Sequence, residues 1–506
     1  MAFRQNNSLT KLLLIAIAGI LAACGQDDAG TQTEAPAAAA PTQPADTSGN
    51  NSGLMPHQQL ARDLLKELIE IDTTHSKGNT TTASEAMAAH LIAAGFPAED
   101  VQVLGPKPDK GNLVVRFRGR AVDRKPILLL AHIDVVEADP ADWTLDPFTF
   151  VEEDGYYYGR GTSDDKDEAA INIANLIRLK QEGFQPDRDI IVALTADEEG
   201  GTDNGVVWLL ENHRDLIDAE YALNEGGGGA MKNGERISNA VQASEKVYQS
   251  FMLEVTNPGG HSSLPVKNNA IYHLADALTR IRDYDFPVSL NEVTRVYFER
   301  SAAIEEGELA DAMRGVLAEP PDVDAVAYLS GTPFYNSRLR TTCVATMLSG
   351  GHAENALPQR ARATVNCRVL PGEPIESVQR ALETAIDDDR VVLTRVAEAN
   401  PSPPSPLTPE VLGPIERITE ELWPGVPVIP TMSTGATDGL FLRNAGIPVY
   451  GVSGLFGEID DKPRARSERA HSHSLVLRRS GVSLPVDEGF VAGGHAVDVR
   501  GDTPYI

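Results

Sequence analysis

The stretch Leu194-Thr195-Ala196-Asp197-Glu198-Glu199-Gly200-Gly201 decides how the rest of the chain is interpreted. It follows an apolar run, Ile190 to Leu194, that is typical of a buried strand, and it continues into a glycine-rich turn. Two adjacent carboxylates at the end of a buried strand are costly unless a cation lies nearby. A bare Glu-Glu pair is more often a solvated strand end, so its meaning depends on what else the chain places there.

Other segments carry histidine or carboxylate groups in comparable positions. They are Ala131-His132-Ile133-Asp134 after the apolar run Ile127 to Leu130, Gly161-Thr162-Ser163-Asp164-Asp165-Lys166, Asn224-Glu225-Gly226, and Arg469-Ala470-His471. Open α/β sheets place their sites at the carboxyl ends of their strands. Imidazole nitrogen and carboxylate oxygen together suit zinc. The sequence therefore predicts a zinc site built from strand ends.

In this order, the segments resemble the co-catalytic di-zinc peptidase and aminoacylase family, which includes carboxypeptidase S, aminoacylase, carnosinase and succinyl-diaminopimelate desuccinylase. The resemblance runs from about Leu54 to about His471. It implies an α/β fold in which a mostly parallel-sheet catalytic domain carries an inserted, smaller α/β lid domain of the dimerisation type. The alternation of apolar strands and amphipathic helices along the chain agrees with such a sheet, with helices on both faces.

The resemblance also implies roles for the motif residues. One zinc would be held by His132, Asp164 and Glu225, and the other by Asp164, Glu199 and His471, with Asp164 as the bridge. The family pattern often has a cis peptide bond after this bridging aspartate. Asp134, on the same strand face as His132, would fix the imidazole tautomer, and Glu198 would be the general base. Two Zn2+ ions per subunit are expected, with Co2+ or Mn2+ as alternatives.

Further residues resemble the family's lid and substrate groups. His261, in Gly260-His261-Ser262-Ser263, resembles the lid histidine that stabilises the tetrahedral oxyanion, often from the partner subunit of a dimer. Arg368 and Asn355 resemble groups that hold the α-carboxylate of the substrate. Gly435 resembles a residue whose backbone contacts the substrate. A capping or surface histidine, a sheet-surface arginine and a turn asparagine are the ordinary alternatives.

The N-terminus resembles a bacterial lipoprotein signal. Residues 1–23 combine Arg4 and Lys11 with a short apolar core, and Leu21-Ala22-Ala23-Cys24-Gly25 predicts cleavage before Cys24 and lipidation of its thiol. An ordinary secretory signal is the alternative. Because residue 25 is not aspartate, the outer membrane, facing the periplasm, is the expected location. Residues 24–53 are rich in Ala, Pro, Thr, Gln and Ser, which predicts a flexible tether.

The remaining chain of about 450 residues is too long for one ordinary core. The expected organisation is a catalytic domain formed by residues 54–242 and 400–471, a lid domain inserted over 243–399, and an atypical tail over 472–506. In the tail, glycines and prolines replace the closing amphipathic helix of the family. We interpret this departure as a shift of the reading frame just after His471.

The net charge and the cysteine content exclude some classes of partner and some kinds of cysteine site. A net charge of −29 argues against nucleic acid or an anionic membrane surface as a direct partner. Of three cysteines, the lipidated Cys24 leaves Cys343 and Cys367, too few for a disulfide framework or a thiolate zinc cluster. These two lie on strands expected to pair in an oxidising compartment, so a disulfide between them is an open alternative to two free thiols.

The sequence thus predicts a lipid-anchored di-zinc metallopeptidase. It would hydrolyse an amide next to a free α-carboxylate, as a carboxypeptidase or dipeptidase. One alternative is an N-acyl-amino-acid amidohydrolase, whose motifs are the same. An alternative of another class is a lipoprotein that binds peptides without turnover, against which Glu198 argues because a pure binder needs no base. The expected partners are a small peptide or N-acyl amino acid, and a second copy through the lid domain.

Overall fold

The computed structural model describes residues 54–121, 123–153, 156–459, 477–478, 490–492 and 495–497. The predicted signal peptide, Cys24, the tether and His471 lie outside the described residues.

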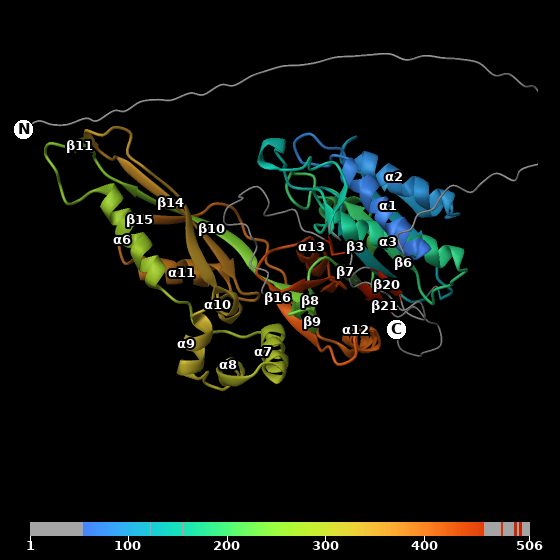
Figure 1. The fold of residues 1–506 in the computed structure, drawn as a ribbon. Coiled ribbons are helices and arrows are strands. Elements are labelled where there is room, and N and C mark those ends of the chain that lie inside the picture. Colours follow the sequence, from blue (N-terminus) through green and yellow to red (C-terminus); the bar gives the residue numbers. More distant parts are fainter. Residues whose placement is uncertain are drawn as a thin grey trace, which may run out of the picture. The chain divides into compact units, whose positions relative to one another are not determined.

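A large mixed sheet forms the centre of the main α/β region (Figure 1). Its order is β1-β2-β6-β3-β7-β17-β9-β8-β18, and β16 also pairs with β9. The strands are β1 (Val101–Leu104), β2 (Asn112–Phe117), β6 (Ile190–Thr195), β3 (Ile127–His132), β7 (Tyr221–Asn224), β17 (Val449–Val452), β9 (Glu235–Glu245), β8 (Gly228–Lys232), β18 (Phe456–Glu458) and β16 (Val428–Ser433). The central pairs β6–β3, β3–β7 and β7–β17 are parallel. The completely buried strands β3 and β6 explain the uniform apolar runs in the sequence.

Helices cover both faces of this sheet, as predicted. On one face, α1 (Pro56–Glu70), α2 (Thr80–Ala93) and α3 (Lys166–Gln181) pack in one core cluster with the strand residues Leu129 and Val192. On the other, α4 (Gly205–Asn212), α5 (Arg214–Ile217) and α13 (Gly439–Asn444) pack with Leu128 and Ile191. Neighbouring residues of one strand thus serve opposite cores, because side chains alternate along a strand. The α12 helix (Pro409–Leu422) joins the first cluster.

A buried lysine fixes the end of α1. The Lys166 Nζ donates to the carbonyls of Leu68 at 2.8 Å and Ile71 at 2.9 Å. Leu68 lies in the last turn of the helix and Ile71 is its C-cap residue, and the Leu68 carbonyl also accepts the Ile71 amide at 3.3 Å. Because Lys166 opens α3 directly after Asp165, this bond ties α1 to the segment that carries the predicted bridging aspartate.

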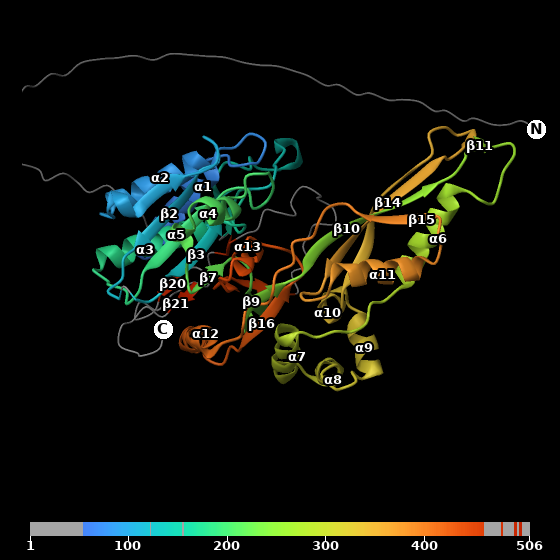
Figure 2. The same cartoon turned by 180° about the vertical axis from the view of Figure 1, so that it is seen from behind.

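A second, four-stranded sheet has the order β12-β14-β10-β15 and is antiparallel throughout. Its strands are β12 (Thr342–Gly350), β14 (Arg360–Val369), β10 (Val247–Thr256) and β15 (Val391–Arg395). The helices α6 (Ala270–Asp283) and α11 (Ile375–Ile386) share a core with it, which Figure 2 shows from behind. A two-stranded ribbon, β11 (Gly260–His261) with β13 (Ala356–Leu357), extends from this sheet's loops.

Four helices fill an insertion over residues 287–340, within the span that the sequence predicts as the lid domain. They are α7 (Glu292–Ile304), α8 (Gly307–Gly315), α9 (Val323–Ser330) and α10 (Pro333–Leu339). They enclose their own small core around Phe298, Met313 and Leu329. Near the start of α7, Val293 packs into the core of the large sheet, and the Arg300 guanidinium donates to the Val428 carbonyl at 2.7 Å. The insertion is therefore anchored on the large sheet.

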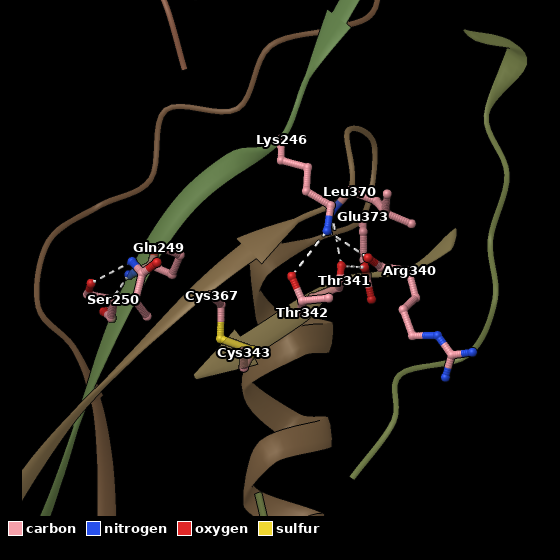
Figure 3. Close-up of a disulfide and its surroundings, with 11 residues drawn as sticks. Lys246, Gln249, Ser250, Arg340, Thr341, Thr342, Cys343, Cys367, Leu370 and Glu373 are labelled. Atoms are coloured by element: carbon pink, nitrogen blue, oxygen red, sulfur yellow. Dashed lines mark hydrogen bonds between the residues drawn. A yellow bond between two sulfur atoms is a disulfide. The ribbon is translucent and has the colours of Figure 1, made fainter. Parts of the chain in front are cut away.

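Lys246 stands where the chain passes from one sheet to the other (Figure 3). Its buried Nζ donates to the Arg340 carbonyl at 2.7 Å and to the Thr342 hydroxyl at 3.2 Å. Ala243 still packs in the large-sheet core, whereas Val247 packs in the core of the small sheet. The change of core lies at Lys246, and the exact limits of the two domains stay a prediction.

Cys343 and Cys367 form a disulfide with an S–S distance of 2.01 Å (Figure 3). They face each other directly across β12 and β14, which are paired as the sequence predicted. Of the two alternatives that the sequence left open, the structure has the disulfide.

The remaining described elements are short. They are the 3-10 turns Ala98–Asp100 and Pro140–Asp142, the sheet β4 (Val151–Glu153), β5 (Tyr156–Tyr158) and β19 (Leu477–Arg478), and the pair β20 (Phe490–Ala492) and β21 (His495–Val497). The described residues of the tail are thus strands. They do not test the predicted frame shift. Among the helices of the described ranges, none is both long and apolar enough to cross a membrane.

Candidate active site

Two groups of potential metal ligands meet at His132. One consists of His132, Asp164 and Glu199, and the other of His132, Glu198 and Glu225. Within each group, one ligand atom from every residue lies within 4.8 Å of the others. The structure therefore brings together all the predicted ligands that lie in the described residues.

His132 is the buried centre of this arrangement. It ends β3, and its Nε2 lies 3.0 Å from Asp164 Oδ1. Its Nδ1 lies 3.1 Å from the backbone carbonyl of Asp134 and 3.6 Å from that residue's carboxylate. Burial alone would lower the pKa of His132, but Asp134 and Asp164 outweigh it and hold the pKa well above its usual value.

Asp164 reaches the site from a turn before α3. Its carboxylate is half exposed, which suits a group that must reach a bound ion. The peptide bond between Asp164 and Asp165 is cis, as the family pattern led us to expect. Asp165 itself is buried, and its carboxylate accepts the His132 amide at 3.3 Å, so this turn is fastened to the end of β3.

Glu198 and Glu199 lie on a turn and not on the strand itself. The turn follows β6 and contains Asp197 with a φ of 57°. Asp134 holds it, because its Oδ1 accepts the Glu198 amide and its Oδ2 accepts the Glu199 amide, each at 3.0 Å. The carboxylate of Asp134 thus orients the glutamate turn, while its carbonyl contacts the imidazole. The two glutamates still belong to different ligand groups.

The electrostatics of this cluster favour a bound cation. Burial raises the pKa of Glu198 to about 9, that of Glu225 to about 8 and that of Glu199 to about 7. The neighbouring carboxylates add to each of these increases. Carboxylates this close together are stable in their charged form only beside positive charge. The donor set of imidazole and carboxylates fits zinc or a similar divalent metal.

A second loop supports the site. Asp438 accepts the Asn204 amide at 2.6 Å and the Thr195 hydroxyl at 3.4 Å, and burial raises its pKa to about 7. Next to it, Thr437 donates its amide and its hydroxyl to Glu245 at 3.1 and 3.0 Å. These contacts fix the end of the loop that also carries the predicted substrate residue Gly435.

The predicted lid and substrate residues form two separate sets of contacts. His261 pairs with Ala356 across β11 and β13, and Ser262 donates its amide to the Asn355 carbonyl at 2.9 Å, so His261 and Asn355 lie in one ribbon. Arg368 reaches the Thr434 carbonyl at 3.4 Å and lies over the Tyr248 ring at 4.8 Å. Within the described residues of the chain, none of these groups contacts His132.

Sequence reasoning missed two residues that support the site. Lys110 pairs with Asp197 at 2.6 Å, and Asn204 bridges Asp438 and the Asp197 carbonyl. Lys110 and Asn204 sit in polar loops without any motif, so no sequence pattern distinguishes them.

Arg160 also supports the site, and it directly precedes the segment Gly161 to Lys166 that carries Asp164. Burial lowers the pKa of its guanidinium, while Glu199 and Asp164 counteract that change. Its positive charge therefore interacts with the carboxylates of Glu199 and Asp164, two of the predicted metal ligands.

Comparisons with known proteins agree with this geometry. Residues 128–476 match the model of peptidase family M20/M25/M40. The N-fatty-acyl-amino acid synthase/hydrolase PM20D1 of Xenopus tropicalis is 31% identical over 431 residues, which cover 82% of this chain and 83% of that relative. The probable carboxypeptidase S-like 2 of Dictyostelium discoideum is 31% identical over 338 residues, 65% of this chain and 64% of the relative.

A solved structure shows the same fold. The M20 family metallo-carboxypeptidase Sso-CP2 of Sulfolobus solfataricus aligns with a TM-score of 0.58 at 18% identity, over 83% of this chain and 95% of that one. The family match spans most of the described chain and includes His132, Asp164, Glu198, Glu199 and Glu225. The chain therefore belongs to peptidase family M20/M25/M40 and is a metallohydrolase.

Proposed function

We propose that the chain hydrolyses an amide bond next to a free α-carboxylate, as a carboxypeptidase or dipeptidase acting on small peptides. The observation that carries this proposal is the placement of Glu198 and Glu199 in two ligand groups that share His132. Such an arrangement offers two metal positions side by side, and when Glu198 does not serve as a ligand its carboxylate can handle protons. Relatives named as carboxypeptidases support the substrate class.

Two Zn2+ ions would be held by residues of this cluster. His132, Asp164 and Glu225 would bind one, and Asp164, Glu199 and His471 would bind the other, with Co2+ or Mn2+ as substitutes. When bound, such a pair supplies an activated water and polarises the scissile carbonyl. Geometry alone also groups Glu198 with Glu225. The choice of Glu198 as base and Glu225 as ligand follows the family resemblance.

Glu198 would move the protons of the reaction. It accepts a proton from the attacking water and passes it to the leaving amine, which then departs as a neutral group. The turn that carries Glu198 is held by Asp134 through two backbone amides, so the carboxylate has a fixed starting position. A fixed position matters because proton transfer requires hydrogen-bond distance to the reacting atoms.

His261 would donate a hydrogen bond to the developing oxyanion. Its Nδ1 accepts the Ser263 amide at 3.2 Å and lies 2.8 Å from the Ser263 hydroxyl. A neutral imidazole whose Nδ1 accepts a hydrogen bond carries its proton on Nε2. This tautomer is therefore the one that can donate from Nε2 to substrate.

Arg368 would hold the α-carboxylate. The planar guanidinium forms paired hydrogen bonds to carboxylates. Its position over Tyr248 and beside Thr434 limits its rotation. Asn355 and Gly435 would complete the substrate contacts, each from a segment that already touches a predicted site residue.

A substrate panel tests this function. The purified chain would be given dipeptides, the same dipeptides with an amidated C-terminus, and N-acyl amino acids, and product amines would be quantified. We expect cleavage only when the free α-carboxylate is present. Equal cleavage of the amidated peptides would contradict the predicted role of Arg368.

The second candidate is hydrolysis of N-acyl amino acids. It is favoured by relatives named N-fatty-acyl-amino acid synthase/hydrolase, which align with about four-fifths of this chain. The same panel separates the candidates, because a preference for the acyl amino acids would select this one. If the protein is instead a peptide-binding lipoprotein, it should bind the peptides of the panel without releasing any product amine.

We also propose a homodimer whose interface includes β12, the edge strand of the small sheet. Val344, Met347 and Leu348 on this strand are mostly exposed. Leu348→Asp should then shift the molar mass measured by light scattering from dimer to monomer. An unchanged mass would reject this interface.

The proposed location rests on the sequence around Cys24 alone. Lipidation of its thiol would anchor the chain in the outer membrane, facing the periplasm. The wild-type protein should therefore incorporate labelled fatty acid, whereas Cys24→Ser should not. A wild-type protein without the label would reject the anchor.

A further inference from the structure

The turn that presents Glu198 contains a buried ion pair. Lys110 Nζ lies 2.6 Å from Asp197 Oδ1, and the two side chains are 6% and 0% exposed. Lys110 lies in the loop between β1 and β2, whereas Asp197 directly precedes Glu198. We propose that Lys110 and Asp197 are positioning residues, whose ion pair holds the turn in the conformation that presents Glu198 and Glu199 to the metal site.

The backbone of Asp197 needs such support. Its φ of 57° lies in the left-handed region, which L residues other than glycine seldom adopt. Aspartate tolerates this region when its side chain hydrogen-bonds nearby. Here Oδ1 contacts Lys110 and Oδ2 accepts the Asp203 amide at 3.2 Å. Both carboxylate oxygens of Asp197 are thus used to hold the turn.

The packing around the Asp197 carboxylate is tight. A Cβ on Gly201 would lie 2.1 Å from Asp197 Oδ2 and 2.9 Å from His75 Nδ1, so only glycine fits beside the carboxylate. Gly201 also has a φ of 118°, which excludes most other residues. The second glycine of the Glu-Glu-Gly-Gly run therefore makes room for the ion pair.

The rest of the turn is fastened by neighbours of this pair. The Ala196 amide donates to Asn112 Oδ1 at 2.9 Å, and the Asp197 carbonyl accepts from Asn204 at 3.2 Å. Asn112 opens β2, two residues after Lys110. The start of β2 and the loop before it thus form one support for the turn, and Asp134 holds its other end.

General stabilisation of the fold is a poor explanation for this ion pair, since a buried pair can often be replaced by apolar groups without loss. Both partners instead lie within the support of the two glutamates, and their hydrogen bonds go to the turn rather than to the predicted ligands. The consequence for turnover rests on the proposed hydrolysis, whereas the consequence for the turn itself does not.

The test compares Lys110→Met and Asp197→Gly with Lys107→Met in the full-length protein as purified. Asp197→Gly keeps the left-handed backbone accessible but removes the ion pair. Lys107 is the matched control, because it lies in the same loop and pairs with Asp203 at 2.5 Å on the surface. Amide hydrogen exchange at Glu198 and Glu199 would be measured together with bound zinc, kcat and KM.

We expect both test variants to exchange the Glu198 and Glu199 amides at least about tenfold faster than wild type. We also expect kcat to fall about 10- to 100-fold with KM little changed, because a small displacement of the base slows the chemical step. Zinc should be held more weakly as well, because Glu199 lies on the same turn. Lys107→Met should match wild type in every readout. Asp197→Asn tolerates the left-handed region and keeps one acceptor for Lys110, but its NH2 would face the Asp203 amide, so its activity should lie between those of wild type and Asp197→Gly.

Unchanged exchange in both Lys110→Met and Asp197→Gly would overturn the inference. So would full activity of Asp197→Gly, since the backbone conformation would then suffice without the pair. If wild type cleaves no substrate but the exchange changes as expected, the proposed hydrolysis fails and the positioning role stands.

Discussion

At the scale of single residues, the site depends on His132, which is shared by both ligand groups. Its ring is fixed between Asp134 and Asp164, and the turn that carries Glu198 and Glu199 is fixed by the carboxylate of the same Asp134. One aspartate thus sets the orientation of both the imidazole and the glutamates. Because Asp134 contacts both groups, His132 and Asp134 together predict the site better than either residue alone.

His261 provides a prediction at this scale. His261→Ala should lower kcat by about 10²–10³-fold if the imidazole donates to the oxyanion. Bound metal should stay at the wild-type level, because His261 belongs to neither ligand group. Steady-state kinetics and metal analysis on the same preparation would check this. Normal turnover in the variant would show that the ribbon histidine is a surface residue.

At the scale of elements, buried or strongly amphipathic segments were predictable. The apolar runs Ile127 to Leu130 and Ile190 to Leu194 form the buried strands β3 and β6, because a continuous apolar run favours a fully buried strand. The helices α7 to α10 were not predicted, although they enclose a small core of their own. The left-handed conformation of Asp197 was not predicted either, because aspartate adopts it only occasionally.

The junction lysine gives a pH prediction for these elements. Burial lowers the pKa of Lys246 to about 7, although Glu373 opposes the change. The unfolded chain keeps this proton up to its ordinary pKa of 10.5. Between about pH 7 and 10.5 the unfolded state therefore binds more protons, and this residue makes the free energy of unfolding rise with pH, by at most about 1.4 kcal/mol per unit.

Urea denaturation at pH 7, 8 and 9 would measure this effect against Lys246→Met. The variant should lack the contribution of Lys246 to the rise, so the difference between the two free energies of unfolding should change with pH. Parallel profiles would mean that Lys246 titrates in the folded protein as it does in the unfolded chain.

At the scale of the whole molecule, the family assignment rests on strand ends that lie far apart in the sequence and meet at one edge of the sheet. The proximity of His132, Asp164, Glu199 and Glu225 was predictable for this reason. The supporting contacts of Lys110, Asn204 and Asp438 were not, because they depend on loop conformations that no local pattern specifies.

The last metal ligand can be assigned by comparing the two histidines at the start of the tail. His471→Ala should lose one zinc per chain, whereas His473→Ala should keep both, because His471 is in register with the family motif. Metal analysis of the two purified variants would decide. Loss of zinc only in His473→Ala would place the ligand two residues further on. Resequencing the 3′ end of the gene would test the frame shift itself.

The central claim is that adjacent glutamates have different tasks, and one measurement tests it most directly. Zinc content and kcat would be determined for Glu198→Gln and, as its matched control, Glu199→Gln. We predict that Glu198→Gln binds as much zinc as wild type and loses about 10²–10⁴-fold in kcat, because only proton transfer is removed. Glu199→Gln should lose zinc as well. A Glu198→Gln variant that loses zinc, or that keeps wild-type turnover, would contradict the assignment of Glu198 as the base.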